Sequence, residues 1–183
     1  MSGPTRLLLD KHALSTAEGS VVRRYFEGTG GLARGLALTD EEQQAILLVH
    51  LARGKGYRLF LSTEAHNLLL AHGRQVAPTE MLMFLKRVEV LYPTRYFKRW
   101  ARRVRQRTFS REDAKVLALA TFGTDETGDV LGVHRVVTLD RPLVRKWERE
   151  QELLAQRVRE MTEHLAMPFV LATLPRVQLP EDI

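Results

Sequence analysis

The alternation of apolar and polar positions divides the chain into short strands separated by helices. Arg6–Leu9 is a mostly apolar run that ends at Asp10, and it predicts a first strand buried on both faces. Apolar runs at residues 57–61 and 88–91 predict the next two strands. Strands that alternate with helices are typical of a parallel sheet with right-handed crossovers. The pattern therefore predicts an α/β fold, a three-layer α/β/α sandwich with a mainly parallel central sheet.

Capping residues, glycines and prolines mark the helices of the first half. Residues 39–42 (TDEE) form a capping box, which predicts a helix over residues 39–53 that stops at Gly54. Other helices are predicted over residues 13–26, 63–71, 78–85 and 94–107. Gly73 is expected to terminate the helix predicted at residues 63–71. The glycine-rich segment 28–35 predicts a loop, because it lacks the spacing of a dinucleotide-binding fingerprint and of a phosphate loop.

The second half carries a strong helix–strand–helix pattern. Ser110 and Asp113 form a capping box before an apolar helix, and residues 136–138 predict a β-branched strand. Asp140 then precedes a long amphipathic helix. Its apolar positions recur at helical spacing: Leu143, Trp147, Leu154, Val158, Met161 and Leu165.

The end of the chain predicts one more strand and a tail. Residues 169–172 are apolar and are expected to form the last strand. Residues 176–183 contain proline and acidic residues and are expected to be an extended tail. A single domain over residues 1–175 follows from the length, since about 100–200 residues make one domain.

Composition narrows the class of protein. The chain has no cysteine, which excludes disulfides and thiolate metal sites. No apolar run approaches the ~18 residues of a membrane span, and the first ten residues lack the features of a signal peptide, so we expect a cytoplasmic protein without a membrane partner. The net charge of +6 comes mainly from arginine, whose planar fork of donors suits phosphate. An arginine-rich proteome would explain this charge equally well.

Three aspartates are placed where the predicted elements converge. Asp10 and Asp140 follow strands, and Asp113 lies in the first turn of a helix that enters the same region. Ligands of open parallel sheets bind outside the carboxyl ends of strands. Clustered carboxylates repel one another unless a cation such as Mg²⁺ or Mn²⁺ compensates their charge. Taken singly, each aspartate is better explained as a helix cap, but one fold that gathers all three favours a metal site.

The three motifs, in this order, resemble the PIN-domain family of metal-dependent ribonucleases. Family members open with an apolar strand ending in Asp, as LLLD does at Asp10. A helix of the form D-A-x-x-x-A-x-A is matched by Asp113, Ala114, Ala118 and Ala120. A strand ending T-x-D is matched by Thr138 and Asp140, and the resemblance spans roughly residues 6–172.

The resemblance implies a role for each matched residue. Asp10, Asp113 and Asp140 would be catalytic residues that hold Mg²⁺ or Mn²⁺, and the Thr138 hydroxyl would support them. A typical member also has an acid, often as Glu-Leu, on the helix after the second strand. Asn67 stands closest to that position here and Glu64 lies one turn earlier, so Glu64 is the fourth candidate acid. If Asn67 replaces the acid, metal affinity or activity would be weakened.

The residues after Asp10 depart from the family pattern. Lys11 stands where many members have a small hydroxyl residue. It would either contact phosphate or partly neutralise the acids in place of a metal. His12 is best read as a helix-surface residue, and the histidines show no zinc-type spacing.

The predicted helix at residues 94–107 is strongly basic. Arg99, Arg102, Arg103 and position 106 share one helical face, which predicts a positive stripe able to hold a nucleic-acid backbone. The same pattern is explained equally well by arginines that are simply solvated and contact no phosphate. Phe97 and Trp100 are expected in the core rather than stacked on bases.

We therefore expect an endoribonuclease that cleaves RNA phosphodiester bonds with one or two divalent cations. A toxin with an antitoxin partner is one role in the family, and a homodimer is left open. The principal alternative is a catalytically inactive PIN-like domain that binds nucleic acid or protein. A small-molecule or response-regulator-like α/β protein would instead predict a pocket without a basic rim.

Overall fold

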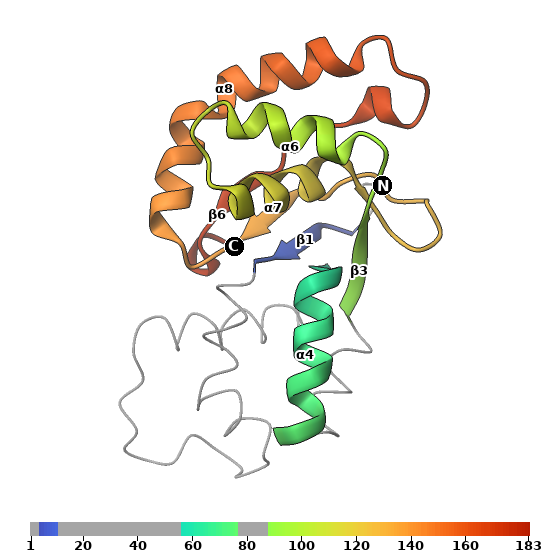
Figure 1. Ribbon diagram of the computed structural model, residues 1–183, viewed down its shortest axis with the longest axis vertical. Coiled ribbons are helices and arrows are strands. Elements are labelled where there is room, and N and C mark those ends of the chain that lie inside the picture. The colour runs from blue at the N-terminus through green and yellow to red at the C-terminus, as the bar shows by residue number, and fades with distance from the viewer. Residues whose placement is uncertain (1–3, 11–55, 77–87) are drawn as a thin grey trace.

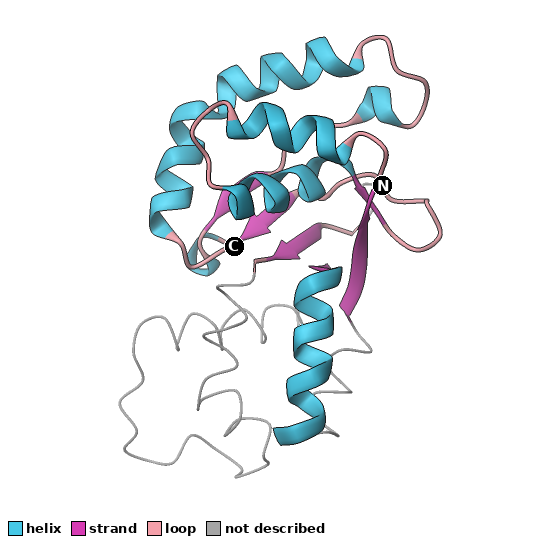
Figure 2. Ribbon diagram, viewed as in Figure 1, coloured by secondary structure: helices cyan, strands magenta, loops and turns pink. Residues whose placement is uncertain are grey.

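In the part of the chain that the structure describes, six strands form one curled, mostly parallel sheet in the order β4-β3-β2-β1-β5-β6 (Figure 2). The computed structural model describes residues 4–10, 56–76 and 88–183. The strands are β1 Arg6–Leu9, β2 Arg58–Ser62, β3 Val88–Pro93, β4 Gly123–Thr124, β5 Arg135–Val137 and β6 Arg176–Gln178. The central strand β1 is parallel to both neighbours, β2 and β5, and the edge strand β4 is antiparallel to β3. Curling turns β3 away from the direction of β1 (Figure 1).

Three helices cover one side of the sheet, and α4 leaves it in the opposite direction (Figure 1). The helices are α4 Thr63–Val76, α6 Phe97–Arg105, α7 Arg111–Phe122 and α8 Arg141–Thr162, with short 3₁₀ turns η1 Phe169–Leu171 and η2 Pro180–Asp182. The helix α7 lies nearest the sheet, and α6 packs against α7.

The core lies between the sheet and these three helices. Trp100 and Val104 of α6 are fully buried, and the Trp100 ring meets Phe122 of α7 edge-on at 6.3 Å between centroids. Phe97 is partly buried against the same cluster. Burying each such side chain stabilises the fold by about 1.5–3 kcal/mol. The prediction that Phe97 and Trp100 belong to the core is confirmed.

Most predicted strands and helices of the described ranges are present, with shifted ends. The strand predicted at 57–61 is β2, β3 runs two residues past its predicted end, and α6 is shorter than the predicted helix 94–107. The helix α4 does not end at Gly73 but continues to Val76, because an isolated glycine costs a helix only ~1 kcal/mol. The elements predicted at residues 13–26, 28–35, 39–53 and 78–85 lie outside the described residues.

The predictions for the end of the chain are wrong. The segment predicted as the last strand forms η1, and the predicted extended tail contributes β6, which pairs with β5. A short apolar run does not distinguish strand from helix. Phe169 packs its ring edge-on against Tyr96 at 4.7 Å, whereas Val177 and Leu179 are the buried residues beside β5.

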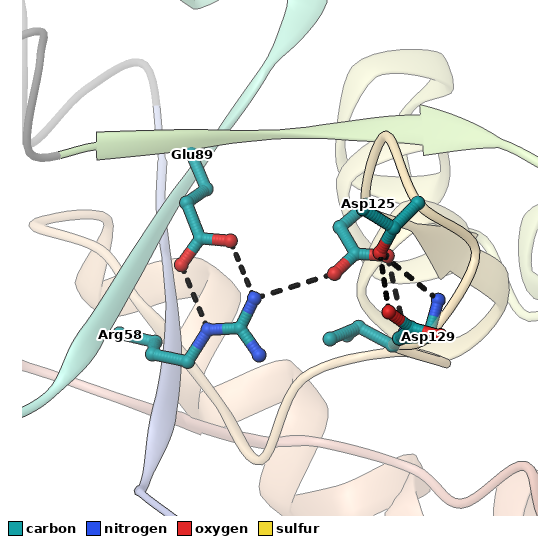
Figure 3. A network of polar contacts seen from close by, with 6 residues as sticks. Arg58, Glu89, Asp125 and Asp129 are labelled. Atoms are coloured by element: carbon teal, nitrogen blue, oxygen red, sulfur yellow. Dashed lines mark hydrogen bonds and ion pairs between the residues drawn. The ribbon is translucent and has the colours of Figure 1, made fainter.

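A polar network joins β2, β3 and the loop after β4 (Figure 3). Arg58 donates to both carboxylate oxygens of Glu89 at 2.7 and 2.5 Å, and to Asp125 Oδ2 at 3.3 Å. Asp125 Oδ1 accepts hydrogen bonds from the Val130 amide at 3.1 Å and the Thr127 hydroxyl at 3.2 Å. Burial alone would raise the pKa of Asp125, but these bonds together with Arg58 outweigh it and lower the pKa.

We expect Asp125→Asn to lower the free energy of unfolding by about 1–3 kcal/mol at neutral pH, because the substitution removes a buried charged acceptor. Since the folded pKa is lowered, this stabilisation is present above the ordinary aspartate pKa of ~3.9 and is lost as pH falls through the lower folded value. Urea denaturation from pH 7 to pH 3 should show the difference shrinking below pH ~4. Asp182→Asn, an exposed change in η2, is the control; a difference independent of pH would contradict the assignment.

The loop between β4 and β5 returns through a tight contact at Gly132. The Gly132 φ is +59°, and its N–H donates to the Gly123 carbonyl at 2.8 Å. A Cβ at this position would lie 2.7 Å from the Ala120 carbonyl oxygen and 2.8 Å from that of Thr121. Gly128 also has a positive φ, of +81°, but a Cβ there meets nothing within 4 Å.

Gly132→Ala should therefore destabilise the fold more than Gly128→Ala. Backbone strain of about 1–3 kcal/mol is common to both positions, and the steric clash is specific to Gly132. Thermal unfolding of the two variants measures the difference, and equal losses would show that the close approach is not maintained in solution.

Candidate functional site

The carboxyl ends of β1 and β5 bring Asp10 and Thr138 together. Leu9 is paired with Val137, and the Asp10 amide continues this pairing by donating to the Val137 carbonyl at 3.0 Å. The Thr138 hydroxyl then donates to Asp10 Oδ2 at 2.8 Å. Asp10 is 6% exposed and Thr138 is fully buried. Buried polar groups are stable only when they are hydrogen-bonded, so the two side chains support each other.

Asp140 is linked to this pair through the same hydroxyl. Its backbone N–H donates to Thr138 Oγ1 at 3.1 Å, while its own Oδ1 accepts from the Leu143 amide at 3.0 Å and caps α8. The capping explanation for Asp140 is therefore correct. A cap uses one carboxylate oxygen, and Oδ2 of Asp140 accepts no hydrogen bond from any residue in the described ranges.

Asp113 lies in the first turn of α7, on the side of the sheet where the strands end. The Ser110 hydroxyl caps α7 by accepting from the Asp113 amide at 3.0 Å, which confirms Ser110 as the N-cap residue. The other end of α7 is fixed beside the start of β5, where the Val133 amide donates to the Ala120 carbonyl at 2.8 Å. The helix thus runs antiparallel to β5, and α7 and α8 both begin on the side toward which β1 points (Figure 1). Asp113 is half-buried.

The two residues considered for the fourth acid position, Glu64 and Asn67, are exposed on α4. The helix begins directly after β2, so Glu64 also lies at the carboxyl edge of the sheet. Glu64 forms no hydrogen bond or ion pair within the part of the chain that is described. Lys11 and His12 lie outside the described residues.

The donor set at this edge fits a hard divalent cation in its chemistry. Carboxylate and hydroxyl oxygens are the ligands that Mg²⁺ and Mn²⁺ prefer, and Mg²⁺ is commonly held by one or two carboxylates with water and substrate phosphate. Across residues 4–10, 56–76 and 88–183, however, no group of three His, Asp or Glu side chains is arranged to hold a metal. The pair that the structure brings together is Asp10 and Asp140, joined by Thr138.

The predicted positive stripe lines a cleft between α6 and α8. Arg99, Arg102, Arg103 and Gln106 form one wall, as their shared helical face predicts, and Arg157 and Glu160 of α8 form the other. The cleft is open and has a volume of about 480 Å³. The α8 wall was not predicted, because nothing in the local sequence around Arg157 indicates that α8 passes over α6.

Comparison with protein-family models and with curated proteins gives no match to this chain. Among the described residues, no helix is long and apolar enough to cross a membrane.

Thr138→Val should reduce the free energy of unfolding by about 1–3 kcal/mol, because it leaves the buried Asp10 carboxylate without its hydroxyl donor. Thr121→Val is the matched control. Thr121 is equally buried, but its hydroxyl only supplements a helical carbonyl, that of Leu117 at 2.8 Å. Urea denaturation should show a clearly larger loss for Thr138→Val; equal losses would mean that the Asp10 contact contributes nothing.

Proposed function

We propose that this chain is a cytoplasmic metal-dependent endoribonuclease with a PIN-like three-layer α/β/α fold. The observation that carries the proposal is the junction of Asp10, Thr138 and Asp140 at the carboxyl ends of adjacent parallel strands. In sheets of this kind ligands bind outside the strand ends. The ordered motifs that resemble PIN domains supply the reaction class, and the fold alone does not.

Each residue of the junction has a distinct task in the proposed reaction. Asp10 and Asp140 would hold Mg²⁺ or Mn²⁺, with Asp113 on the first turn of α7 as a further acid. A bound cation of this kind activates water and offsets the charge that develops on a phosphate during in-line attack. Thr138 fixes the carboxylate of Asp10, because the single hydroxyl proton is committed to Oδ2.

The helices that begin at this edge also favour a phosphate substrate. The N-termini of α7 and α8 carry the positive ends of their helix dipoles, which attract anions. The glutamate candidate Glu64 lies in the first turn of α4 at the same edge. A scissile phosphate outside β1 and β5 would therefore face both acidic metal ligands and partial positive charge.

The decisive experiment measures cleavage of a single-stranded RNA of mixed sequence with and without Mn²⁺. We expect cleavage that needs the metal and that falls at least about 100-fold in Asp113→Asn and Asp140→Asn, because loss of a ligand removes several kcal/mol of transition-state stabilisation. Asparagine remains a good helix cap, so Asp140→Asn keeps the start of α8. Glu152→Gln, an exposed acid on α8, is the control. Metal-independent cleavage, or full activity in both variants, would refute the proposal.

A catalytically inactive nucleic-acid-binding domain is the second candidate function. It is favoured by the exposure of Glu64 and by the capping roles that Asp140 and the α7 start already fulfil. The same assay separates the two functions. No cleavage, together with salt-sensitive RNA binding that neither aspartate substitution changes, would establish the binding domain.

A further inference from the structure

The cleft between α6 and α8 concentrates positive charge, of which a single lining carboxylate offsets only a part. Four arginines, Arg99, Arg102, Arg103 and Arg157, line it together with one acid, Glu160. The Glu160 carboxylate accepts a hydrogen bond from Gln156 of its own helix at 2.9 Å. None of the four arginines forms an ion pair or a side-chain hydrogen bond within the described residues.

A neighbouring arginine does form an ion pair between the two helices. Arg107, just past α6, donates to Glu150 of α8 at 2.6 Å, and this pair joins the two helices. Lys146 of α8 likewise donates to the Thr108 carbonyl and lies 4.8 Å from the centre of the Phe109 ring. Arg107 and Lys146, which lie outside the cleft, therefore make the contacts between α8 and the α6–α7 connection.

Arg99 opposes the stability of the helix that carries it, whereas Arg102 and Arg103 lie in the last turn of α6, where the dipole favours positive charge. Arg99 lies in the first turn of α6, where the helix dipole disfavours positive charge and where no acid is present. Arg99 is followed at i+3 and i+4 by Arg102 and Arg103, and like charges at these spacings destabilise a helix by about 0.2–0.5 kcal/mol per pair. Residues that oppose local stability are expected at functional sites.

We propose that the α6–α8 cleft binds the phosphate backbone of single-stranded RNA, at a position separate from the acidic edge of the sheet. Guanidinium groups from two helices provide the forked donors that phosphate oxygens accept. A volume of about 480 Å³ lined by cations suits a polyanion, whereas pockets for small organic ligands are lined mainly by apolar side chains. The identity of the ligand as RNA rests on the proposed function.

The position of the cleft indicates what it contributes. Figure 1 shows α8 crossing above α6, on the side of α6 away from α7 and the sheet. The acidic edge of the sheet, which carries Asp10 and Asp140, lies at the carboxyl ends of β1 and β5, on the side where α7 and α8 begin (Figure 1). The cleft would hold a part of the RNA strand remote from the scissile phosphate, so it would affect substrate affinity and leave the chemical step unchanged.

The test is the affinity of a fluorescently labelled single-stranded RNA, measured by anisotropy in EDTA so that no cleavage occurs. Arg99→Gln/Arg102→Gln/Arg157→Gln should raise Kd at least about tenfold and flatten the salt dependence of log K by about 2, because each lost phosphate contact removes about 0.7 from the slope. The control with the same net charge is Arg145→Gln/Arg159→Gln/Arg176→Gln, whose side chains are exposed and outside the cleft. Equal losses in the two triple variants would overturn the inference.

A single pair of variants gives a second, sharper comparison on one helix. Arg157 and Arg159 are two residues apart on α8 and therefore point about 200° away from each other. Arg157→Glu should weaken RNA binding several-fold more than Arg159→Glu, with the same change in net charge. Unchanged RNA binding in Arg157→Glu would show that the cleft is not an RNA-binding site. Another partner, such as an acidic protein segment, would then be the candidate ligand of the cleft.

Cleavage assays separate this inference from the proposed function. If the wild type cleaves RNA in Mn²⁺, the cleft triple variant should show a raised KM with kcat within about twofold. If the wild type does not cleave but the cleft variants alone lose binding, the cleft is supported and the ribonuclease proposal fails. Cleavage with an unchanged KM in the triple variant would refute the cleft and leave the ribonuclease proposal standing.

Discussion

The position of β1 between two parallel partners is the constraint on which the rest of the structure depends. A strand paired in parallel on both sides places its own carboxyl end level with those of its neighbours, β2 and β5. The residues that directly follow these three strands therefore lie at the same edge of the sheet. Asp10, the start of α4 and the Thr138–Asp140 segment meet there for this reason, and the hydroxyl of Thr138 links two of them directly.

The packing of α6 directs its arginines away from the sheet. The buried side chains of α6, Trp100 and Val104, hold that helix on α7, and its arginines consequently face outward toward α8. The acids, by contrast, are carried by strand ends and by first turns of helices. An anionic polymer would meet arginines in the α6–α8 cleft and carboxylates at the strand ends, and it would be tolerated at the carboxylates only with a cation present.

Local patterns in the sequence were enough to predict features that depend on neighbouring residues. The strand ending at Asp10, the N-cap at Ser110, and the shared face of Arg99, Arg102 and Arg103 are of this kind, and each is present in the structure. Features set by long-range pairing were missed. Nothing local distinguishes the run at 169–172 from a strand, and β6 is a strand because β5 offers it an open edge. Arg157 lines the cleft because α8 passes over α6, and no local pattern in the sequence predicts this packing.

The lengths of the edge strands affect whether a strand of another chain can pair with the sheet. The edge strand β6 has three residues, and the edge strand β4 has two, which pair with only Tyr92 and Pro93 of the six-residue β3. An exposed strand edge must be long and flat to serve as a template for another strand, and short edges prevent such pairing and the aggregation that follows from it. In the described part of the chain, the short β6 edge is therefore a poor template for strand addition, and a partner on that side has to recognise side chains.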